Sequence, residues 1–396
     1  MALTALPSLL AACVMLAIGA FLADRLTLLS RFSIPAPIVG GLLFAVLTLL
    51  LQQVVGVGFT RDPTTRSTLL LLFFASIGLS ADLSLLRRGG PRLLRFLVAL
   101  FPFLIMQDAL GTVMAQLLGL NLVLGLIAGS ITLVGGHGTG AAYAERFAAD
   151  YGLPGVMGLT MMSATIGLVI GGVLGGPVAG ALIRRLGMLP AAQESGDVIG
   201  GPAKRPVTTN TLTIALVAVL AAVIAGQAVS AALEGSAVTV PSFLWCLLVG
   251  LVLRNALAVV GLRLPDAATE LIGSVSLSLF LVWTMMNLDL AGVVSLAGPL
   301  LIILAGQTVL VALWARLVVF RICGRDYEAA VSAGAFCGFA MGATATAIAN
   351  MQAVTRRYGP APESFVVVPT VGALFVDLMN LAVLTFFLIP GLVVGR

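Results

Sequence analysis

Charged residues are scarce in this chain. Only 9% of its 396 residues are charged, whereas about 25% are charged in an ordinary soluble domain. There is one histidine, His137, and one lysine, Lys204. A water-soluble fold needs polar and charged groups to cover its surface. The composition therefore excludes a soluble globular protein.

Sequence patterns of enzymes and metal sites are also missing. The chain has no GxSxG or HExxH pattern, no P-loop and no soluble dinucleotide-binding domain, and this argues against an enzyme. If the chain were an uphill transporter, the lack of an ATP-binding module would leave an ion gradient as its source of energy. The cysteines have neither CxxC nor metal-ligand spacing, so we interpret them as packing residues: Cys13, Cys246, Cys323 and Cys337.

Apolar residues dominate instead. They make up 60% of the chain, and the mean hydropathy is +1.14. Helices of roughly 20 apolar residues cross a bilayer, and such runs recur throughout, so we expect an all-α polytopic membrane protein. No basic segment precedes the first run, which predicts a retained span and not a cleaved signal. The expected spans are 5–23, 33–55, 68–86, 96–118, 154–183, 208–233, 241–260, 268–288, 297–320 and 365–390.

Two further apolar stretches, 122–149 and 328–355, are interrupted by glycine-rich sequence. Each is a poor straight span and a good re-entrant hairpin or broken helix. Glycine and alanine let the backbone leave helical geometry and approach a ligand. A broken helix exposes N–H groups that suit a carboxylate and carbonyls that suit Na⁺ or an ammonium group.

Basic residues predict the orientation of the chain. If it starts outside and each broken stretch returns to its own side, 17 of the 21 Lys and Arg residues fall in inside loops. This positive-inside bias places both termini outside and the polar segment 184–207 in the cytoplasm. We therefore read the net charge of +5 as orienting the chain in its bilayer and not as binding nucleic acid.

The two halves of the chain resemble each other at an offset close to 205 residues. Pro35 corresponds to Pro241, HGTGAA at 137–142 to MGATATA at 341–347, and TIGLVIGG at 165–172 to TVGALFVD at 370–377. We therefore expect an N-terminal repeat, 1–183, a cytoplasmic linker, 184–207, and a C-terminal repeat, 208–396. Each repeat has five spans and a hairpin. Five is odd, so the repeats are inverted, as in carriers that work by alternating access and in some channels.

The two breaks hold most of the candidate binding groups. We expect substrate contacts from Gly136, His137, Gly138, Thr139, Gly140, Thr344, Thr346, Asn350 and Gln352. The alternative is glycine-mediated helix packing, with the threonines bonded to their own helices. For His137 the choice is open between substrate contact or gating and a satisfied structural side chain. A lone histidine is weak support for a metal site.

Polar residues inside spans are the other candidates, because burying an ionisable group in lipid is costly. Asp377 and Asn380 share a helix face, and with Thr370 they form a polar stripe. We expect Asp377 to pair with a substrate ammonium or Na⁺ and Asn380 to act as a neutral ligand; the alternative is a structural hydrogen bond. Asp108 and Gln107 either line the site or bond across helices. The candidate Na⁺ ligands are Gly135, Gly342, Ala343, Thr370 and Asp377.

Asp82 and Asp289 occupy equivalent positions of the two repeats, near the ends of spans. Helix ends are exposed to water and carry dipole charge. A capping role is therefore at least as good an interpretation as a functional one.

The segments GGHGTGAAY at 135–143, MGATATAIANMQAVTRRYG at 341–359 and VGALFVDLMN at 371–380 resemble the bacterial glutamate:sodium symporters. The likeness covers essentially the whole chain and implies Na⁺-driven uptake of L-glutamate across the bacterial inner membrane. It places the family's signature residues at 135–140 and 342–346. It also implies hairpins that enter from opposite faces and, through related citrate carriers, a homodimer with a mobile transport domain sliding against a fixed scaffold.

Two rival functions remain at this point. One is a carrier of another small amino acid or carboxylate, driven by Na⁺ or by protons, since Asp377 and His137 could also serve H⁺. The other is a channel that uses both hairpins as a filter.

Overall fold

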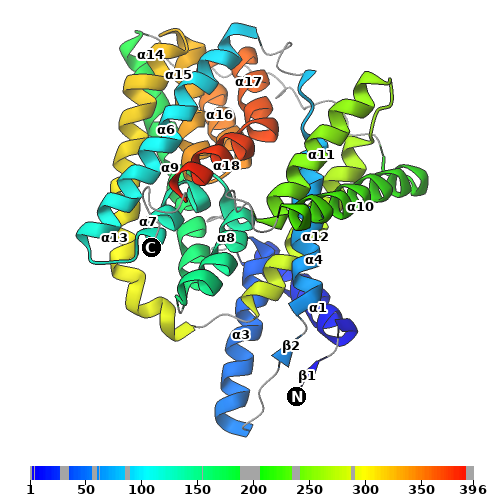
Figure 1. Cartoon of the computed structure of the whole chain (residues 1–396). Helices are drawn as coiled ribbons and strands as arrows, with labels where there is room; N and C mark the ends of the chain where they lie inside the picture. The colour runs from blue at the N-terminus through cyan, green and yellow to red at the C-terminus, as the bar shows by residue number, and fades with distance from the viewer. Residues whose placement is uncertain are drawn as a thin grey trace. The chain divides into compact units, whose positions relative to one another are not determined.

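The computed structural model describes residues 2–3, 5–26, 35–55, 60–61, 63–84, 90–153, 155–187, 206–233, 241–286 and 290–388. These residues form a helical protein (Figure 1). One short parallel pairing joins β1 (Ala2–Leu3) to β2 (Thr60–Arg61). Most of the predicted linker and Asp289 lie outside the described residues.

The helices follow the predicted apolar runs closely. They are α1 (Ala5–Arg25), α3 (Ala36–Val55), α4 (Pro63–Ser80), α6 (Gly90–Leu117), α7 (Leu122–Leu126), α8 (Gly136–Tyr151), α9 (Val156–Arg185), α10 (Thr209–Ala232), α11 (Ser242–Val259), α12 (Asp266–Met285), α13 (Leu290–Trp314), α14 (Phe320–Ile322), α15 (Tyr327–Met341), α16 (Thr344–Tyr358), α17 (Pro362–Leu374) and α18 (Val376–Phe387). Two π-helical segments, η1 (Ile127–Ile131) and η2 (Ala315–Val319), follow α7 and α13.

Among the described residues, 7 helices are long and apolar enough to cross a membrane, or up to 8 when the bent pair α17–α18 counts as one span. The protein is therefore a multi-span membrane protein. The two remaining predicted spans, 33–55 and 68–86, coincide with α3 and α4, whose apolar stretches are shorter, at Ala36–Thr48 and Thr65–Ser80. Of the ten predicted spans, seven or eight are therefore long and apolar enough in the described structure to cross a membrane.

The chain divides into two compact units, and each draws on both halves of the sequence. Unit 1 comprises Met1–Asp82 and Lys204–Asp289; unit 2 comprises Leu83–Ala203 and Leu290–Arg396. Long-range packing therefore joins one segment from each half of the sequence in each unit. Each unit is described separately below.

Unit 1 packs its helices closely through glycine. A Cβ atom added at Gly78 of α4 would lie 2.0 Å from the Leu247 carbonyl of α11, and Gly250 of α11 faces α4 in the same way. At the end of α4, Asp82 lies 3.6 Å from the Arg254 guanidinium, which also pairs with Asp266 at 2.7 Å. Asp82 therefore has a structural ion-pair partner.

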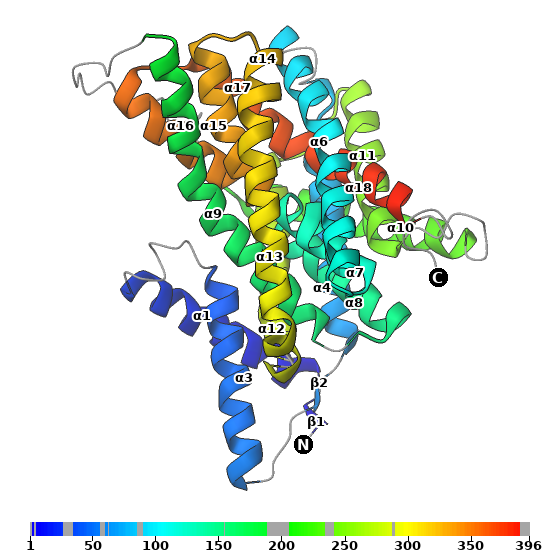
Figure 2. The same ribbon diagram turned by 90° about the vertical axis from the view of Figure 1, so that its left-hand side faces the viewer.

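Unit 2 is built around the long helices α6, α9 and α13 (Figures 1 and 2). Helix α15 packs along α9, and α16 and α17 pack against α15. Aromatic rings fill the space between α6 and α15: Phe103 lies 4.9 Å from Phe336 between ring centroids, and Phe96 contacts both Phe336 and Phe339. Both predicted breaks lie in this unit.

Candidate functional site

The first break interrupts the helical path between η1 and α8. Gly129, inside η1, has φ −104° and ψ −138°, far from helical values. Residues 132–135 separate η1 from α8, and Gly136 opens α8 with φ +67°, a left-handed conformation that favours glycine. The predicted interruption is therefore present, and it brings His137 into the first turn of α8.

The second break separates α15 from α16. Helix α15 ends at Met341, and Gly342 and Ala343 leave the helical path before Thr344 opens α16. Ala343 is fully extended, with φ −168° and ψ 167°. No side chain caps the first turn of α8 or of α16. Both helices therefore present backbone N–H groups that their own caps do not satisfy.

The two breaks approach each other. A Cβ atom added at Gly136 would lie 3.8 Å from the Gly342 carbonyl oxygen. Segments more than 200 positions apart in the sequence thus meet at their interruptions. This juxtaposition is what a binding site made from two broken helices requires.

Glycines of α9 and α17 allow these helices to approach the second break. A Cβ atom at Gly167 would lie 2.5 Å from the Met341 carbonyl, and one at Gly372 would lie 2.1 Å from the Thr344 hydroxyl oxygen. Thr344 and Thr346 lie in the first turn of α16, and both are half-buried, as is Gln352 two turns further on. Thr139 is buried in the first turns of α8.

His137 is buried and has a partner. Its Nε2 lies 3.1 Å from the Thr165 hydroxyl of α9, and that hydroxyl donates its own proton to the Met161 carbonyl at 2.8 Å. Thr165 must therefore accept, and Nε2 of His137 carries the proton that it donates. Among the described residues, no group of three His, Cys, Asp or Glu side chains could hold a metal ion.

Two other predicted site residues, Asn350 and Thr370, make hydrogen bonds to backbone carbonyls within unit 2. The buried Asn350 donates its amide to the Gly171 carbonyl of α9 at 2.9 Å and to the Gly334 carbonyl of α15 at 3.4 Å. It thereby fixes α16 against both helices. Thr370 donates to the Val366 carbonyl of its own helix at 2.6 Å, a contact that leaves its hydroxyl oxygen able to accept or to ligate.

Asp377 and Asn380 lie beyond a third interruption, which the sequence did not predict. Helix α17 bends by 47° into α18. Asp377 occupies the first turn of α18 and is half-buried. Asn380, with 2% of its surface exposed, donates its amide to the Ser130 carbonyl of η1 at 3.2 Å, and so connects α18 to the first break.

Asp108 and Gln107, neighbours on α6, contact the segments that lead into both breaks. Ser130 donates its backbone N–H to Asp108 Oδ1 at 2.7 Å and its hydroxyl to Oδ2 at 2.8 Å. Gln107 donates to the Ala340 carbonyl near the end of α15 at 3.0 Å. Gln307 of α13 donates to the Gln107 carbonyl at 2.8 Å. Sequence reasoning missed Ser130 and Gln307, although each is a polar residue within an apolar run.

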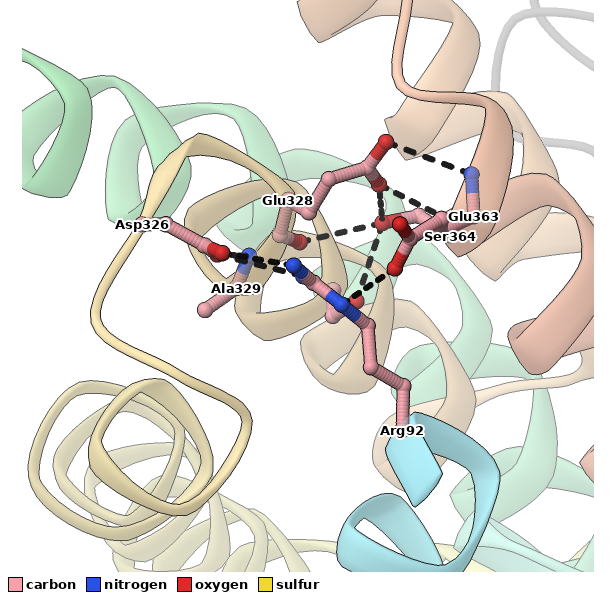
Figure 3. A network of polar contacts seen from close by, with 7 residues as sticks. Arg92, Asp326, Glu328, Ala329, Glu363 and Ser364 are labelled. Carbon is pink, nitrogen blue, oxygen red and sulfur yellow. Dashed lines mark hydrogen bonds and ion pairs between the residues drawn. The ribbon is translucent and has the colours of Figure 1, made fainter. Parts of the chain in front are cut away.

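A charged network at the N-terminal ends of α6, α15 and α17 was also missed (Figure 3). Arg92 donates to both carboxylate oxygens of Asp326, at 3.2 and 2.6 Å, and pairs with Glu363. Asp326 also caps α15 by accepting from Ala329 N–H at 2.8 Å. Glu328 accepts from the Ser364 backbone at 2.9 Å and from its hydroxyl at 2.6 Å. The network fastens the start of the α15–α16 hairpin to its neighbours.

Asp326 lies outside the spanning helices, and its charge is stabilised there. Partial burial acts to raise the pKa of Asp326, but hydrogen bonds from Arg92 and from the Ala329 N–H outweigh it, so the pKa lies below its ordinary value. The carboxylate stays ionised at neutral pH and can serve both Arg92 and the helix.

Comparison with known proteins identifies the family to which the chain belongs. The family model of the sodium/glutamate symporters matches residues 1–360. The sodium/glutamate symporter of Escherichia coli (strain K12) is 43% identical, with 99% of each chain covered. That of Haemophilus influenzae (strain ATCC 51907 / DSM 11121 / KW20 / Rd) is 41% identical over 94% of each chain. A match of this extent includes both breaks, so the chain belongs to the sodium/glutamate symporter family.

Proposed function

We propose that this protein is a Na⁺-coupled carrier of L-glutamate. The observation that carries the proposal is the meeting of two helix starts without side-chain caps inside one compact unit. The relatives are symporters by name, and a symporter is neither an enzyme nor a channel. The chain accordingly belongs among transporters, and glutamate is proposed as its substrate because the relatives are named sodium/glutamate symporters.

Glutamate carries two carboxylates and one ammonium group at neutral pH. In the proposed complex the carboxylates accept hydrogen bonds from the first-turn N–H groups of α8 and α16, where the helix dipoles favour negative charge. The hydroxyls of Thr139, Thr344 and Thr346 add donors. Asp377, half-buried at the start of α18, pairs with the ammonium group.

Na⁺ balances the added negative charge. The carbonyls of Gly135, Gly342 and Ala343 lie at the breaks, and that of Ala343 also accepts from the Ala347 N–H at 3.1 Å. Together with Thr370 and Asp377 they supply oxygen ligands of the kind that broken helices offer to coupling ions. Only the loaded form crosses the bilayer, because an unpaired charge is costly to bury there.

The division into units supports the proposed inverted repeats. Unit boundaries fall after Asp82 and after Asp289, which correspond to each other in the predicted repeats. We propose that unit 2, with both breaks, is the mobile transport domain of an elevator-type carrier, and that unit 1 is the scaffold of a homodimer. The basic-residue bias favours both termini outside and the central linker in the cytoplasm, and the bacterial relatives favour an inner-membrane location.

Counterflow in proteoliposomes tests the function. Vesicles loaded with unlabelled glutamate are expected to accumulate labelled glutamate only when Na⁺ is present. Equal rates with choline in place of Na⁺ would refute Na⁺ coupling, and a rate that follows external pH instead would identify a proton-driven carrier. Stronger competition by another acid than by glutamate would reassign the substrate.

A further inference from the structure

The buried polar cluster of Gln107, Asp108, Ser130, Gln307 and Asn380, here called the Asp108 cluster, contains unsatisfied oxygens. Asp108, Ser130, Gln107 and Gln307 are fully buried and Asn380 is 2% exposed. Within the described part of the chain, Oε1 of Gln107, Oε1 of Gln307 and Oδ1 of Asn380 have no hydrogen-bond partner. A buried amide oxygen without a partner is unfavourable, so the cluster has unused capacity for a ligand.

In the described part of the chain, the atoms of this cluster without any hydrogen-bond partner are all acceptors. Each of the three amide NH₂ groups already donates one hydrogen bond to a backbone carbonyl, of Ala340, Gln107 and Ser130. Asp108 accepts from Ser130 alone, and no positively charged side chain in the described ranges pairs with it. A carboxylate buried in a spanning helix needs a compensating positive charge. Unpartnered oxygens beside an uncompensated carboxylate suit a cation better than an anion.

The position of the cluster relates it to both breaks. Ser130 precedes the first break by a few residues, and its N–H points at Asp108 because Gly129 leaves the helical path. Gln107, the neighbour of Asp108, holds the Ala340 carbonyl just before the second break. Asn380 ties α18, which carries Asp377, to Ser130. A cation seated here would fix the segments that lead into both half-helices.

We propose that the Asp108 cluster binds Na⁺, with the Asp108 carboxylate and the Asn380 amide oxygen as ligands, and that this ion organises both breaks before glutamate binds. The inference rests on the proposed Na⁺-coupled function and adds a site and a coupling route to it. Gln107 is a positioning residue that transmits the ion's presence to the second break. Na⁺ binding at this site thereby raises the affinity of the protein for glutamate.

The test measures ²²Na⁺ binding to the purified full-length protein without glutamate, and then glutamate binding as Na⁺ is varied. For Asp108→Asn we expect Na⁺ affinity to fall at least about tenfold, and the half-saturating Na⁺ for glutamate binding to rise by a similar factor. Asn380→Ala is a second variant, with an expected loss of at least about threefold. K⁺ at equal ionic strength should not replace Na⁺.

Thr112→Val is the matched control. Thr112 lies one turn beyond Asp108 on α6, is also buried, and donates only to carbonyls of its own helix. Its Na⁺ binding should match that of the unaltered protein.

The melting temperature measured without Na⁺ separates a cation ligand from a structural residue. Without Na⁺, Asp108→Asn should be at least as stable as the unaltered protein, because an uncompensated charge has been removed. On addition of Na⁺, the variant should lack the stabilisation that Na⁺ confers on the unaltered protein.

The proposal is overturned if Asp108→Asn and Asn380→Ala both bind Na⁺ like the unaltered protein. It is equally overturned if Asp108→Asn is less stable without Na⁺ yet keeps its Na⁺ affinity, or if K⁺ binds as well as Na⁺. Absence of Na⁺-stimulated glutamate counterflow together with normal, Asp108-dependent ²²Na⁺ binding would instead reject the proposed glutamate carrier while retaining this ion site.

Discussion

At the scale of single residues, Asp377 is the side chain on which glutamate recognition most directly depends in the proposed complex. It occupies the first turn of α18, after the bend from α17. The change Asp377→Asn keeps the shape and removes the charge that pairs with the ammonium group, so we expect Na⁺-dependent glutamate uptake to fall at least about tenfold. Unchanged uptake would exclude this role.

Thr385→Val provides the control for that variant. Thr385 lies further along α18, and its hydroxyl donates to the Leu381 carbonyl of its own helix at 2.8 Å. Its loss should leave uptake as it is. A similar defect in both variants would indicate that α18 had been disturbed and that the charge of Asp377 was not the cause.

Asp326 gives a pH prediction for stability. Its folded-state pKa is below its unfolded value, so its contribution is complete above the unfolded pKa, about 3.9, and is lost as pH falls through the lower folded value. The contribution is about 1 kcal/mol or less, because the Asp326 side chain is 44% exposed and screened by solvent.

The comparison that checks this is the melting temperature of Asp326→Asn against the unaltered protein. The difference should stay constant from about pH 7 to pH 5 and shrink below about pH 4, where Asp326 becomes protonated. An equal difference at pH 3 would show that the ion pair is not its source.

Sequence reasoning located the polar side chains, but it did not identify their hydrogen-bond partners. Asn350 was a candidate substrate contact, yet its amide holds α16 against α9 and α15. Asp108 was left between lining the site and bonding across helices, and Ser130 was not considered. A polar residue in an apolar run indicates that some partner is needed, but the partner is set by long-range packing, which periodicity does not reveal.

At the scale of elements, the packing of α9 against the second hairpin depends on Gly175. A Cβ atom there would lie 2.2 Å from the Asn350 amide nitrogen and 2.4 Å from the Gly334 carbonyl. Gly175→Ala should therefore force α9 and α15 apart and destabilise the protein by about 1–3 kcal/mol. A lowered melting temperature measures the effect.

The adjacent Gly176 is the matched control, because a Cβ atom there meets nothing within 4 Å. Gly176→Ala should be neutral or slightly stabilising, since alanine favours helix by roughly 0.5–1 kcal/mol over glycine. Equal destabilisation by both changes would contradict the close approach of α9 to α15.

Both predicted helix interruptions are present because glycine-rich sequence inside an apolar run has a direct backbone consequence. The interruption between α17 and α18 escaped prediction. Its segment, GALFVD at 372–377, contains one glycine and otherwise reads as continuous apolar helix. Sharp bends of this kind usually have a local cause such as proline or glycine, and Pro369 inside α17 together with Gly372 next to the bend was the signal available in the sequence.

At the scale of the whole molecule, the proposed orientation has a direct test. In a Cys13→Ser background, which removes the exposed native cysteine, Ser195→Cys places a thiol in the predicted cytoplasmic linker. A membrane-impermeant maleimide should label it in inside-out vesicles and not in right-side-out ones, because the basic-residue bias puts the linker inside. Labelling from the outside would reverse the proposed topology.

Unit 2 contains both helix breaks and the Asp108 cluster. If this unit moves as a rigid body, the same hydrogen-bond donors and acceptors bind glutamate on either side of the membrane. No second binding site has to be assembled. Selectivity among substrates should then be identical on import and on export. The direction of net flow is left entirely to the gradients, so a reversed Na⁺ gradient should turn the importer into an exporter of the same cargo.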